Sequence, residues 1–169
     1  ALGEIFPELA LKTHHIGHGM LRLPTGKMSS RTGDVITAEA LIEAVTMKVL
    51  EKMKASDKDL SSNETLVSHI AVGAIKYSIL RQAPGRDVIF DFDTALSFEG
   101  DSGPYLQYTN ARIQSLIQKG SELGIAPALS KQDEVSSLEK TLYRFPEVVA
   151  RAYADYAPHA VATFLIEVA

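Results

Sequence analysis

The sequence predicts a mainly α-helical fold that follows a short β or loop region near the start of the chain. From residue 37 onward, apolar residues recur at three- and four-residue spacing, and breaks containing Gly or Pro divide these patterns into segments. Two parallel strands joined by a crossover helix are not recognisable, and neither is an internal repeat long enough for a solenoid. We therefore expect helices packed on helices, with little sheet.

The first half contains two expected helices. From Thr37, a plausible N-cap, Leu41, Val45 and Val49 recur at four-residue spacing. The polar loop "SDKDLSSN" follows, and Ser61 with Glu64 has capping-box spacing for a second helix over about 62–81. After the turn "APGRD", the stretch "VIFDFD" suits a brief strand, and Phe90, Phe92 and Phe98 are expected in the core.

The second half is expected to be helical throughout. In "EGDSGPY", Asp101 or Ser102 can cap a helix with Pro104 at its first position, and this helix runs to about Gly120. Ser130 and Asp133 again have capping spacing. Three short helical patterns follow, with breaks at Phe145-Pro146 and Ala157-Pro158 because proline can open a helix but not continue one. The last 40 residues therefore predict a helical bundle.

Composition limits the possible functions. The chain has 169 residues, of which 46% are hydrophobic, so it can bury a core. No apolar run approaches the roughly 20 residues of a membrane helix and no secretory signal is visible, so we expect a cytoplasmic protein without a membrane partner. With no cysteine, disulfides, thiolate metal sites and thiol catalysis are excluded. The formal net charge of −4 means that a nucleic acid would need a local basic patch.

Both ends of the sequence predict a piece of a longer protein. The chain starts at Ala1 without an initiator methionine, and it stops inside the apolar helical pattern "PHAVATFLIEVA" without a cap. Processing would explain the missing methionine equally well.

The loop after the first expected strand carries the clearest chemistry. "GMLRLPTGKMSSRTGDV" places Met20, Leu21 and Leu23 in a strand, turns at Pro24-Thr25-Gly26, and then presents Lys27, Ser29, Ser30 and Arg31. Cations, hydroxyls and glycine-flanked backbone amides on one loop are groups that bind a polyphosphate. A solvated hairpin turn is the alternative reading of the same composition.

Lys27-Met28-Ser29-Ser30-Arg31 resembles the KMSKS loop of class I aminoacyl-tRNA synthetases, and its surroundings resemble the arginyl-tRNA synthetase family. The resemblance continues in order through most of the chain. Its further blocks are "VGAIKYSIL", "DVIFDFDTALSFEGDSGPYLQYTNARI" and "RFPEVVARAYADYAPHAVATFLIEVA".

This resemblance implies a specific organisation and activity. Residues 1–103 would be the C-terminal part of a class I catalytic domain, and 104–169 the start of a helical anticodon-binding domain. The intact protein would be an arginine-tRNA ligase that activates arginine with ATP, accompanied by Mg²⁺, and transfers it to tRNA(Arg). Lys27, Ser29, Ser30 and Arg31 would act in catalysis, and Lys27, Met28, Ser29 and Ser30 would bind ATP. The fragment alone is expected to be inactive and to bind no cofactor tightly.

One departure from the family pattern concerns Ser30. The pattern has a second lysine at this position, which is usually the stronger pyrophosphate ligand. Arg31 or Lys27 could replace it, and the sequence leaves the choice open.

The string His15-Ile16-Gly17-His18 matches the HIGH motif of class I enzymes, but its position argues against that role. In those enzymes the motif follows the first strand of the nucleotide-binding fold, far upstream of the lysine loop. Here it directly precedes "GMLRLP", so we interpret it as a coincidence, part of the family's His-x-Gly-x-Gly segment. A metal site at His14, His15 and His18 is disfavoured because adjacent side chains of an extended segment face opposite ways.

A face of the helix after Pro104 is a candidate RNA surface. Tyr105, Gln107, Tyr108 and Arg112, with Asn110 beside them, could stack on and hydrogen-bond to unpaired bases. The alternative, which we favour, is a domain junction packed by these tyrosines, and the resemblance also places the junction here.

The remaining polar residues are weaker candidates. Asp91, Asp93 and Glu99 are too scattered for a metal site or an acid–base pair. His69 is expected in a core or interface and His159 on the surface of a first helical turn. Arg81, Arg86 and Lys119 could contact phosphates, although solvated positions explain them as well.

Two other classes of function stay open from the sequence. One is a free-standing helical module that binds tRNA or a protein without catalysis. The other is a phosphate-binding protein built on the Lys27 loop alone, which would need measurable affinity for ATP.

Overall fold

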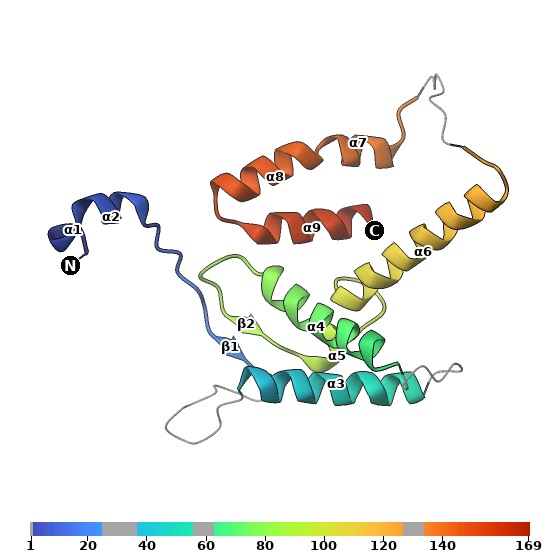
Figure 1. The fold of residues 1–169 in the computed structure, drawn as a ribbon, viewed down its shortest axis with the longest axis horizontal. Helices are drawn as coiled ribbons and strands as arrows, with labels where there is room; N and C mark the ends of the chain where they lie inside the picture. Colours follow the sequence, from blue (N-terminus) through green and yellow to red (C-terminus); the bar gives the residue numbers. More distant parts are fainter. Residues whose placement is uncertain (1, 25–36, 56–62, 127–133) are drawn as a thin grey trace.

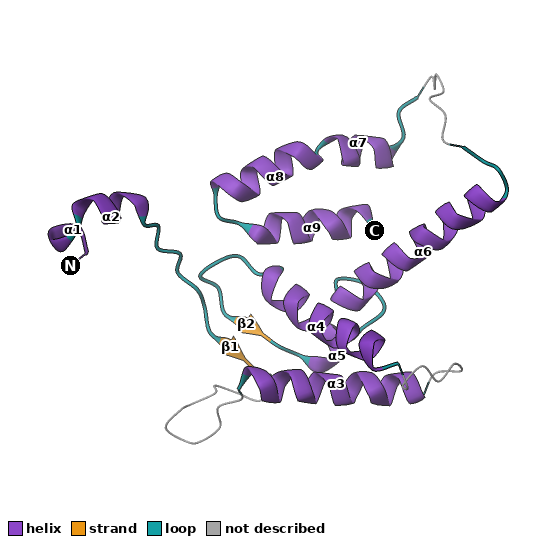
Figure 2. Cartoon of the chain, in the orientation of Figure 1, coloured by secondary structure: helices purple, strands orange, loops and turns teal. Residues whose placement is uncertain are grey.

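A computed structural model describes residues 2–24, 37–55, 63–126 and 134–169. Two short helices, α1 (Leu2–Ile5) and α2 (Pro7–Lys12), form an arm that stands away from the body of the molecule (Figure 1). An exposed segment without regular structure joins this arm to β1 (Leu21–Arg22). Helices dominate the described chain, as the sequence predicts, and the strands are two residues each (Figure 2).

The main core lies between α3 (Ala38–Lys54) and α4 (Glu64–Leu80). The predicted stripe of α3 is confirmed, since Leu41, Val45 and Val49 are all buried. The α4 face that meets it is made of small and branched residues, because Val67, Ala71, Ala74 and Ile75 are buried while Val72 and Ile79 are exposed. Phe90 and Leu96 close this core from the segment after α4.

The strands correct one conclusion from the sequence. β1 pairs in parallel with β2 (Val88–Ile89), Leu21 opposite Val88 and Arg22 opposite Ile89. The connection between them contains α3 and α4, so a parallel pair with helical crossover exists where sequence analysis found none. Periodicity could not reveal it, because a two-residue strand has no period to detect.

Most predicted helix starts are confirmed by their caps. Thr37 accepts a hydrogen bond from the backbone N–H of Ala40, and Ser102 accepts one from Tyr105. For α4 the prediction was wrong: Asn63 is the N-cap, accepting from Leu66, and Ser61 lies outside the described residues. Ser130 and Asp133 also lie outside them.

The stretch "VIFDFD" forms less strand than expected. Only Val88 and Ile89 are extended in a ladder, and Asp91 then caps the short helix α5 (Phe92–Ala95). Phe90 is fully buried and Phe92 packs against the core, as predicted. Phe98 is 49% exposed, so its expected core position was wrong, because the turn before Ser102 carries it outward.

Helix α6 (Gly103–Glu122) begins against α4 and then runs away from the body (Figure 1). Its close start depends on Gly103. A Cβ on Gly103 would lie 2.6 Å from the carbonyl oxygen of Gly73, and this backbone contact excludes a larger residue. A Cβ on Gly73 would instead lie 2.5 Å from Nε2 of Gln107, the end of a flexible side chain.

The chain returns through α7 (Ser137–Tyr143), α8 (Phe145–Ala154) and α9 (Pro158–Val168), which form the predicted short helical bundle. Its breaks fall at the predicted prolines, with Pro146 and Pro158 in the first turns of α8 and α9. Sequence analysis missed the capping box of α7, in which Ser136 and Glu139 bond each other's backbone N–H. Helix α9 packs against α4, so the bundle rests on the main body.

Within the described part of the chain, none of the helices is long and apolar enough to cross a bilayer.

Candidate functional site

The predicted phosphate-binding residues Lys27, Met28, Ser29, Ser30 and Arg31 lie outside the described residues, but the elements that precede and follow them are described. On the N-terminal side, β1 is held by one carboxylate. Asp87 accepts a hydrogen bond from the backbone N–H of Met20 at 2.8 Å and pairs with the guanidinium of Arg22 at 2.5 Å. On the C-terminal side, the Thr37 cap starts α3. The segment that contains Lys27 therefore connects two well-anchored elements.

The edge of the sheet at which this segment begins is relevant to ligand binding. It leaves from the carboxyl end of β1, and the carboxyl end of the parallel strand β2 leads to Asp91 at the same edge. In open parallel sheets, ligands bind outside the carboxyl ends of the strands. The described geometry thus puts the start of the Lys27 segment at the edge where a nucleotide would be expected.

Asp91 is itself committed to local structure. Its carboxylate accepts hydrogen bonds from the hydroxyl and the backbone N–H of Thr94, at 2.7 Å and 2.8 Å. The Thr94 hydroxyl and then its N–H hold the pKa of Asp91 below its ordinary value. The ionised carboxylate of Asp91 therefore serves as the cap of α5.

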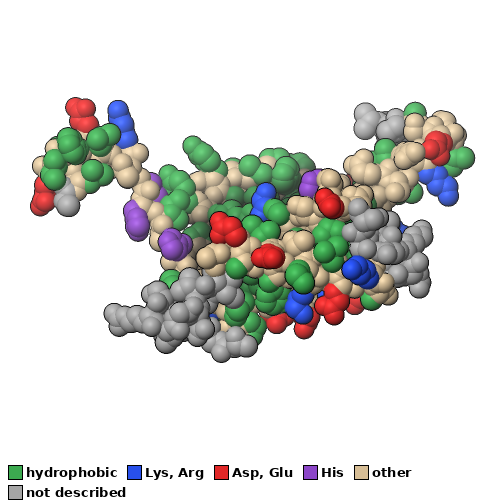
Figure 3. Space-filling view, turned by 60° about the horizontal axis from the view of Figure 1, so that its bottom comes forward, with side chains coloured by type: hydrophobic (Ala, Val, Ile, Leu, Met, Phe, Trp, Pro, Cys, Tyr) green, Lys and Arg blue, Asp and Glu red, His purple; other side chains and the backbone are tan. Residues whose placement is uncertain are grey.

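The HIGH-like string lies in the exposed segment before β1, with α1 and α2 upstream of it. Figure 3 shows histidines on the surface of the segment that joins the arm to the body. No strand precedes the string within the described residues 2–20. Gly19, which follows the string, is required by packing, because a Cβ there would lie 2.1 Å from the carbonyl oxygen of Arg86.

The histidines of this segment have other contacts. His14 stacks on Tyr156, with ring centroids 4.4 Å apart, and Nδ1 of His18 lies 3.0 Å from the carbonyl oxygen of Gly19. Among the residues that the structure describes, no group of three or more His, Asp or Glu side chains could hold a metal ion.

The predicted RNA face of α6 divides into two parts. Tyr108 and Arg112 are exposed and lie together: the guanidinium donates to the Tyr108 hydroxyl at 2.9 Å and sits 5.7 Å from the ring centroid. Asn110 is also exposed. Such a Tyr–Arg pair presents both a ring and a cation to a passing strand of RNA.

Tyr105 and Gln107 face the protein instead. Nε2 of Gln107 donates to the carbonyl oxygen of His69 at 2.9 Å, and its Oε1 is buried without a partner in the described structure. The Tyr105 hydroxyl donates to the carbonyl oxygen of Ala169 at 3.1 Å. Both therefore make contacts within the junction between α6 and its neighbours.

The junction also contains a cluster that sequence analysis did not recognise. Tyr77 donates its hydroxyl proton to Asp101, and Arg81 donates to the Asp101 carbonyl oxygen at 2.9 Å and lies 3.2 Å from its carboxylate. Burial and the hydrogen bond to Asp101 raise the pKa of Tyr77 far above its ordinary value. Asp101 was expected only as a possible cap, because no local pattern links it to residues one helix earlier.

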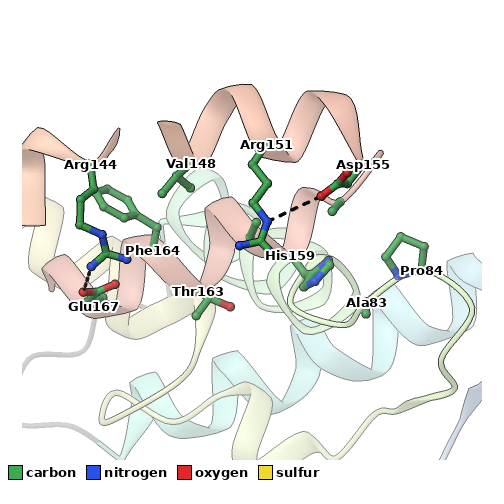
Figure 4. Close-up of a pocket in the computed structure, with 12 residues that line it drawn as sticks. Ala83, Pro84, Arg144, Val148, Arg151, Asp155, His159, Thr163, Phe164 and Glu167 are labelled. Carbon is green, nitrogen blue, oxygen red and sulfur yellow. Dashed lines mark hydrogen bonds and ion pairs between the residues drawn. The ribbon is translucent and has the colours of Figure 1, made fainter. Parts of the chain in front are cut away.

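Other candidates are placed as follows. Arg81 is paired with Asp101, whereas Arg86 and Lys119 are exposed. His69 is exposed, which contradicts a core position, while the alternative expectation of an interface position stays a prediction. His159 does lie in the first turn of α9, but it is half-buried, its Nδ1 is buried, and it lines a pocket beside α8 (Figure 4).

Comparison with protein families accounts for both halves of the chain. The model described as "tRNA synthetases class I (R), catalytic domain" matches residues 2–92, more than half of the 169 residues. The chain belongs to the class I arginyl-tRNA synthetase family. A second model, "DALR anticodon binding domain", matches residues 106–169 of this synthetase chain.

Individual relatives agree with the family. The "Arginine--tRNA ligase" of Thermus thermophilus is 33% identical over 165 residues, which cover 97% of this chain and 28% of the relative. The enzyme of the same name from Pyrococcus furiosus is 32% identical over 181 residues, again 97% of this chain and 28% of the relative. The solved structure of Thermus thermophilus arginyl-tRNA synthetase superposes with a TM-score of 0.76 at 29% identity, covering 96% of this chain and 27% of that one. The synthetase chain thus spans little more than a quarter of these relatives.

Proposed function

We propose that this chain is the part of an arginine-tRNA ligase in which the catalytic domain, residues 1–103, ends and the anticodon-binding domain, residues 104–169, begins. The observation that carries the proposal is the order of the two family matches. A catalytic-domain model and an anticodon-binding model match consecutive segments of one chain, 2–92 and 106–169. A free-standing binding module would not need the catalytic segment, so this order favours the ligase.

In the intact protein, the Lys27 loop would act on ATP. Lys27 and Arg31 supply cations, and Ser29 and Ser30 supply hydroxyls, which together suit the charge that develops on the phosphates during arginine activation. Met28 belongs to the same ATP-binding segment. Mg²⁺ would enter with ATP, held largely by phosphates and water. The anchoring of β1 by Asp87 supports this role, because it fixes the strand from which the Lys27 segment leaves.

The RNA partner would be tRNA(Arg), and the exposed Tyr108–Arg112 pair is the best-placed part of the α6 face to contact it. Tyr105 and Gln107 would support that face from within the junction. A cytoplasmic location follows from this role in protein synthesis.

The test uses the natural polypeptide that contains these 169 residues. We expect ATP–pyrophosphate exchange that depends on arginine and not on other amino acids, measured with and without tRNA, and transfer of labelled arginine to tRNA. A folded polypeptide that supports neither reaction would contradict the proposal and favour a non-catalytic module. Binding of ATP without either reaction would favour the phosphate-binding alternative.

A further inference from the structure

One face of α4 holds the start of α6. His69, Gly73, Tyr77 and Arg81 follow each other at four-residue spacing, so they lie in a row along one side of α4 and its C-cap. Each of them meets the segment 101–107 at the start of α6. From residue 69 to residue 81 a helix rises about 18 Å. This row is therefore long enough to fix a direction for α6 and not only a point of contact.

The row has a polar attachment at each end. At one end, Nε2 of Gln107 donates to the carbonyl oxygen of His69 at 2.9 Å. At the other end, the Asp101 carboxylate accepts the hydroxyl proton of Tyr77 and lies 3.2 Å from the guanidinium of Arg81. Tyr77 is a buried side chain of α4, so Asp101 is attached to an ordered part of the main body. The close backbone contact between the two helices lies between these attachments.

The attachments decide the angle between the helices. The crossing angle of two packed helices is normally set by rows of side chains that interlock. Where Gly103 lies against the backbone of Gly73, neither residue has a side chain to interlock. The direction of α6 therefore depends on the bonds on either side of this contact, those of Gln107 and Asp101.

A small change in this direction has a large effect further along the helix. Helix α6 has 20 residues and runs away from the body (Figure 1). A rotation of about 10° at the start of a helix about 30 Å long moves its far end by about 5 Å. On the other side, α4 leads through its following turn to Asp87, which holds β1. Asp101 thus stands between α6 and the strand that leads to the Lys27 segment.

We propose that Asp101 is a positioning residue for the transfer of arginine to tRNA. By holding Tyr77 and Arg81, it fixes the direction of α6 relative to the main body, and so the distance between the groups that one tRNA contacts at the same time. The inference rests on the proposed function, which supplies the tRNA. Misplacement of contacting groups by about 1 Å is already costly to a reaction, so a shift along α6 matters.

Capping of α6 does not explain Asp101. The N-cap is Ser102, whose hydroxyl oxygen accepts from the backbone N–H of Tyr105. The same hydroxyl donates to the carbonyl oxygen of Ser97 at 2.5 Å. The first turn of α6 is therefore complete without the Asp101 carboxylate, which is free to bond across to α4.

The first test measures the direction of α6 without reference to activity. The 169 residues contain no cysteine, so spin labels are placed at Lys52→Cys on α3 and Ser121→Cys on α6, both exposed. The natural polypeptide is used, with any cysteine elsewhere in it replaced. Pulsed electron paramagnetic resonance should give one narrow distance distribution for the parent. Asp101→Ala should shift or broaden it by several ångströms, and Tyr77→Phe should do so to a smaller extent.

Two matched controls should leave the distribution unchanged. Asp155→Ala also removes a carboxylate from an arginine, but this partner, Arg151, lies one turn earlier on the same helix. Tyr143→Phe also removes a tyrosine hydroxyl, from a side chain that is 87% exposed. Equal shifts in the controls would overturn the assignment to Asp101.

The second test measures charging of tRNA(Arg) by the same variants. Asp101→Ala should raise KM for tRNA about tenfold, the scale of one lost hydrogen bond to a charged group. KM for ATP and for arginine, measured at saturating tRNA, should stay within about twofold. A purely structural role would lower the folded fraction, and thus kcat, and would leave every KM unchanged.

Tyr77→Phe keeps the test decisive if Asp101→Ala does not fold, because it removes only a hydroxyl. It should raise KM for tRNA about threefold, and the double variant should be no worse than Asp101→Ala, since the hydroxyl acts through Asp101. An unchanged KM for tRNA in both single variants would overturn the proposal, with or without a shift in the distances. If the parent does not charge arginine, the proposed function fails instead, and the distances alone then confirm or refute that Asp101 fixes α6.

Discussion

Nε2 of Gln107 on α6 donates to the carbonyl oxygen of His69 on α4 at 2.9 Å, and Gly73 lies directly against the Gln107 amide. This bond joins α6, on which the segment matched by the anticodon-binding model begins, to α4, one of the two helices of the main core. The two helices approach closely here because Gly103 has no Cβ, which would lie 2.6 Å from the carbonyl oxygen of Gly73. The junction is therefore sensitive to single methyl groups.

Gly103→Ala should lower the free energy of unfolding by about 1–3 kcal/mol, as for other overpacked contacts. The new Cβ would lie 2.6 Å from the backbone oxygen of Gly73, and backbone cannot move aside as a side chain can. Gly120→Ala on the same helix is the matched control, because nothing lies within 4 Å of its Cβ. It should raise stability by about 0.5–1 kcal/mol. Urea unfolding of both variants checks the signs, and a stable Gly103→Ala would mean that α6 does not dock as closely as described.

The free energy of unfolding should decrease at high pH, because the stabilising contribution of the protonated Tyr77 is lost there. Its pKa is raised in the folded state by burial and by Asp101, so the folded protein keeps the hydroxyl proton longer than the unfolded chain. Stability from this group is complete below the ordinary tyrosine pKa of about 10 and is lost as the pH rises above it. Tyr77→Phe removes this contribution. Unfolding at pH values on both sides of that pKa should show a smaller decrease for the variant, and identical decreases would contradict the assignment.

Asp91 should make the free energy of unfolding depend on pH in the acidic range. Its pKa is lowered by Thr94, so the stability that it provides is present at neutral pH and is lost as the pH falls through the lowered pKa. Asp91→Ala should cost about 0.5–2 kcal/mol at pH 7 through loss of the helix cap. Asp91→Asn keeps a capping oxygen but does not titrate, so its acid unfolding curve should be flatter than that of the parent. Equal curves would show that the charge of Asp91 is not involved.

Lys27→Ala in the natural polypeptide should reduce the rate of arginine activation more than it weakens ATP binding. A charge-assisted contact made mainly in the transition state contributes about 1.5–3 kcal/mol, which is about 10- to 150-fold in rate. ATP–pyrophosphate exchange at several ATP concentrations separates kcat from KM. Equal losses in the rate and in ATP binding would contradict this role, and a raised KM with an unchanged kcat would place Lys27 in ground-state binding alone.

His15→Ala and His18→Ala should be nearly silent in the same exchange assay. Both residues are exposed in the segment before β1, where no described strand presents them to a nucleotide. Activity within about twofold of the parent is expected, since exposed substitutions have small effects. A loss of about a thousandfold, some 4 kcal/mol of transition-state stabilisation, would show that this string is a working HIGH motif after all.

Local sequence patterns predicted those features that depend on near neighbours. The stripe of Leu41, Val45 and Val49, the caps at Thr37 and Ser102, and the breaks at Pro146 and Pro158 all follow from contacts within a few residues of the chain. Helical periodicity and capping are local, so a single sequence contains them. The family resemblance likewise rests on residues that can be read in order along the chain.

The tertiary structure alone decided features that join distant residues. The parallel pairing of Leu21 with Val88, the bond from Gln107 to His69 and the Tyr77–Asp101 contact connect elements across long stretches of chain. The exposure of Phe98 and the pocket beside His159 were also decided only there. The physical reason is the same for each. The type of a residue determines which kinds of contact its side chain can make, but only the packing of separate helices and strands determines which partner lies close enough to make that contact.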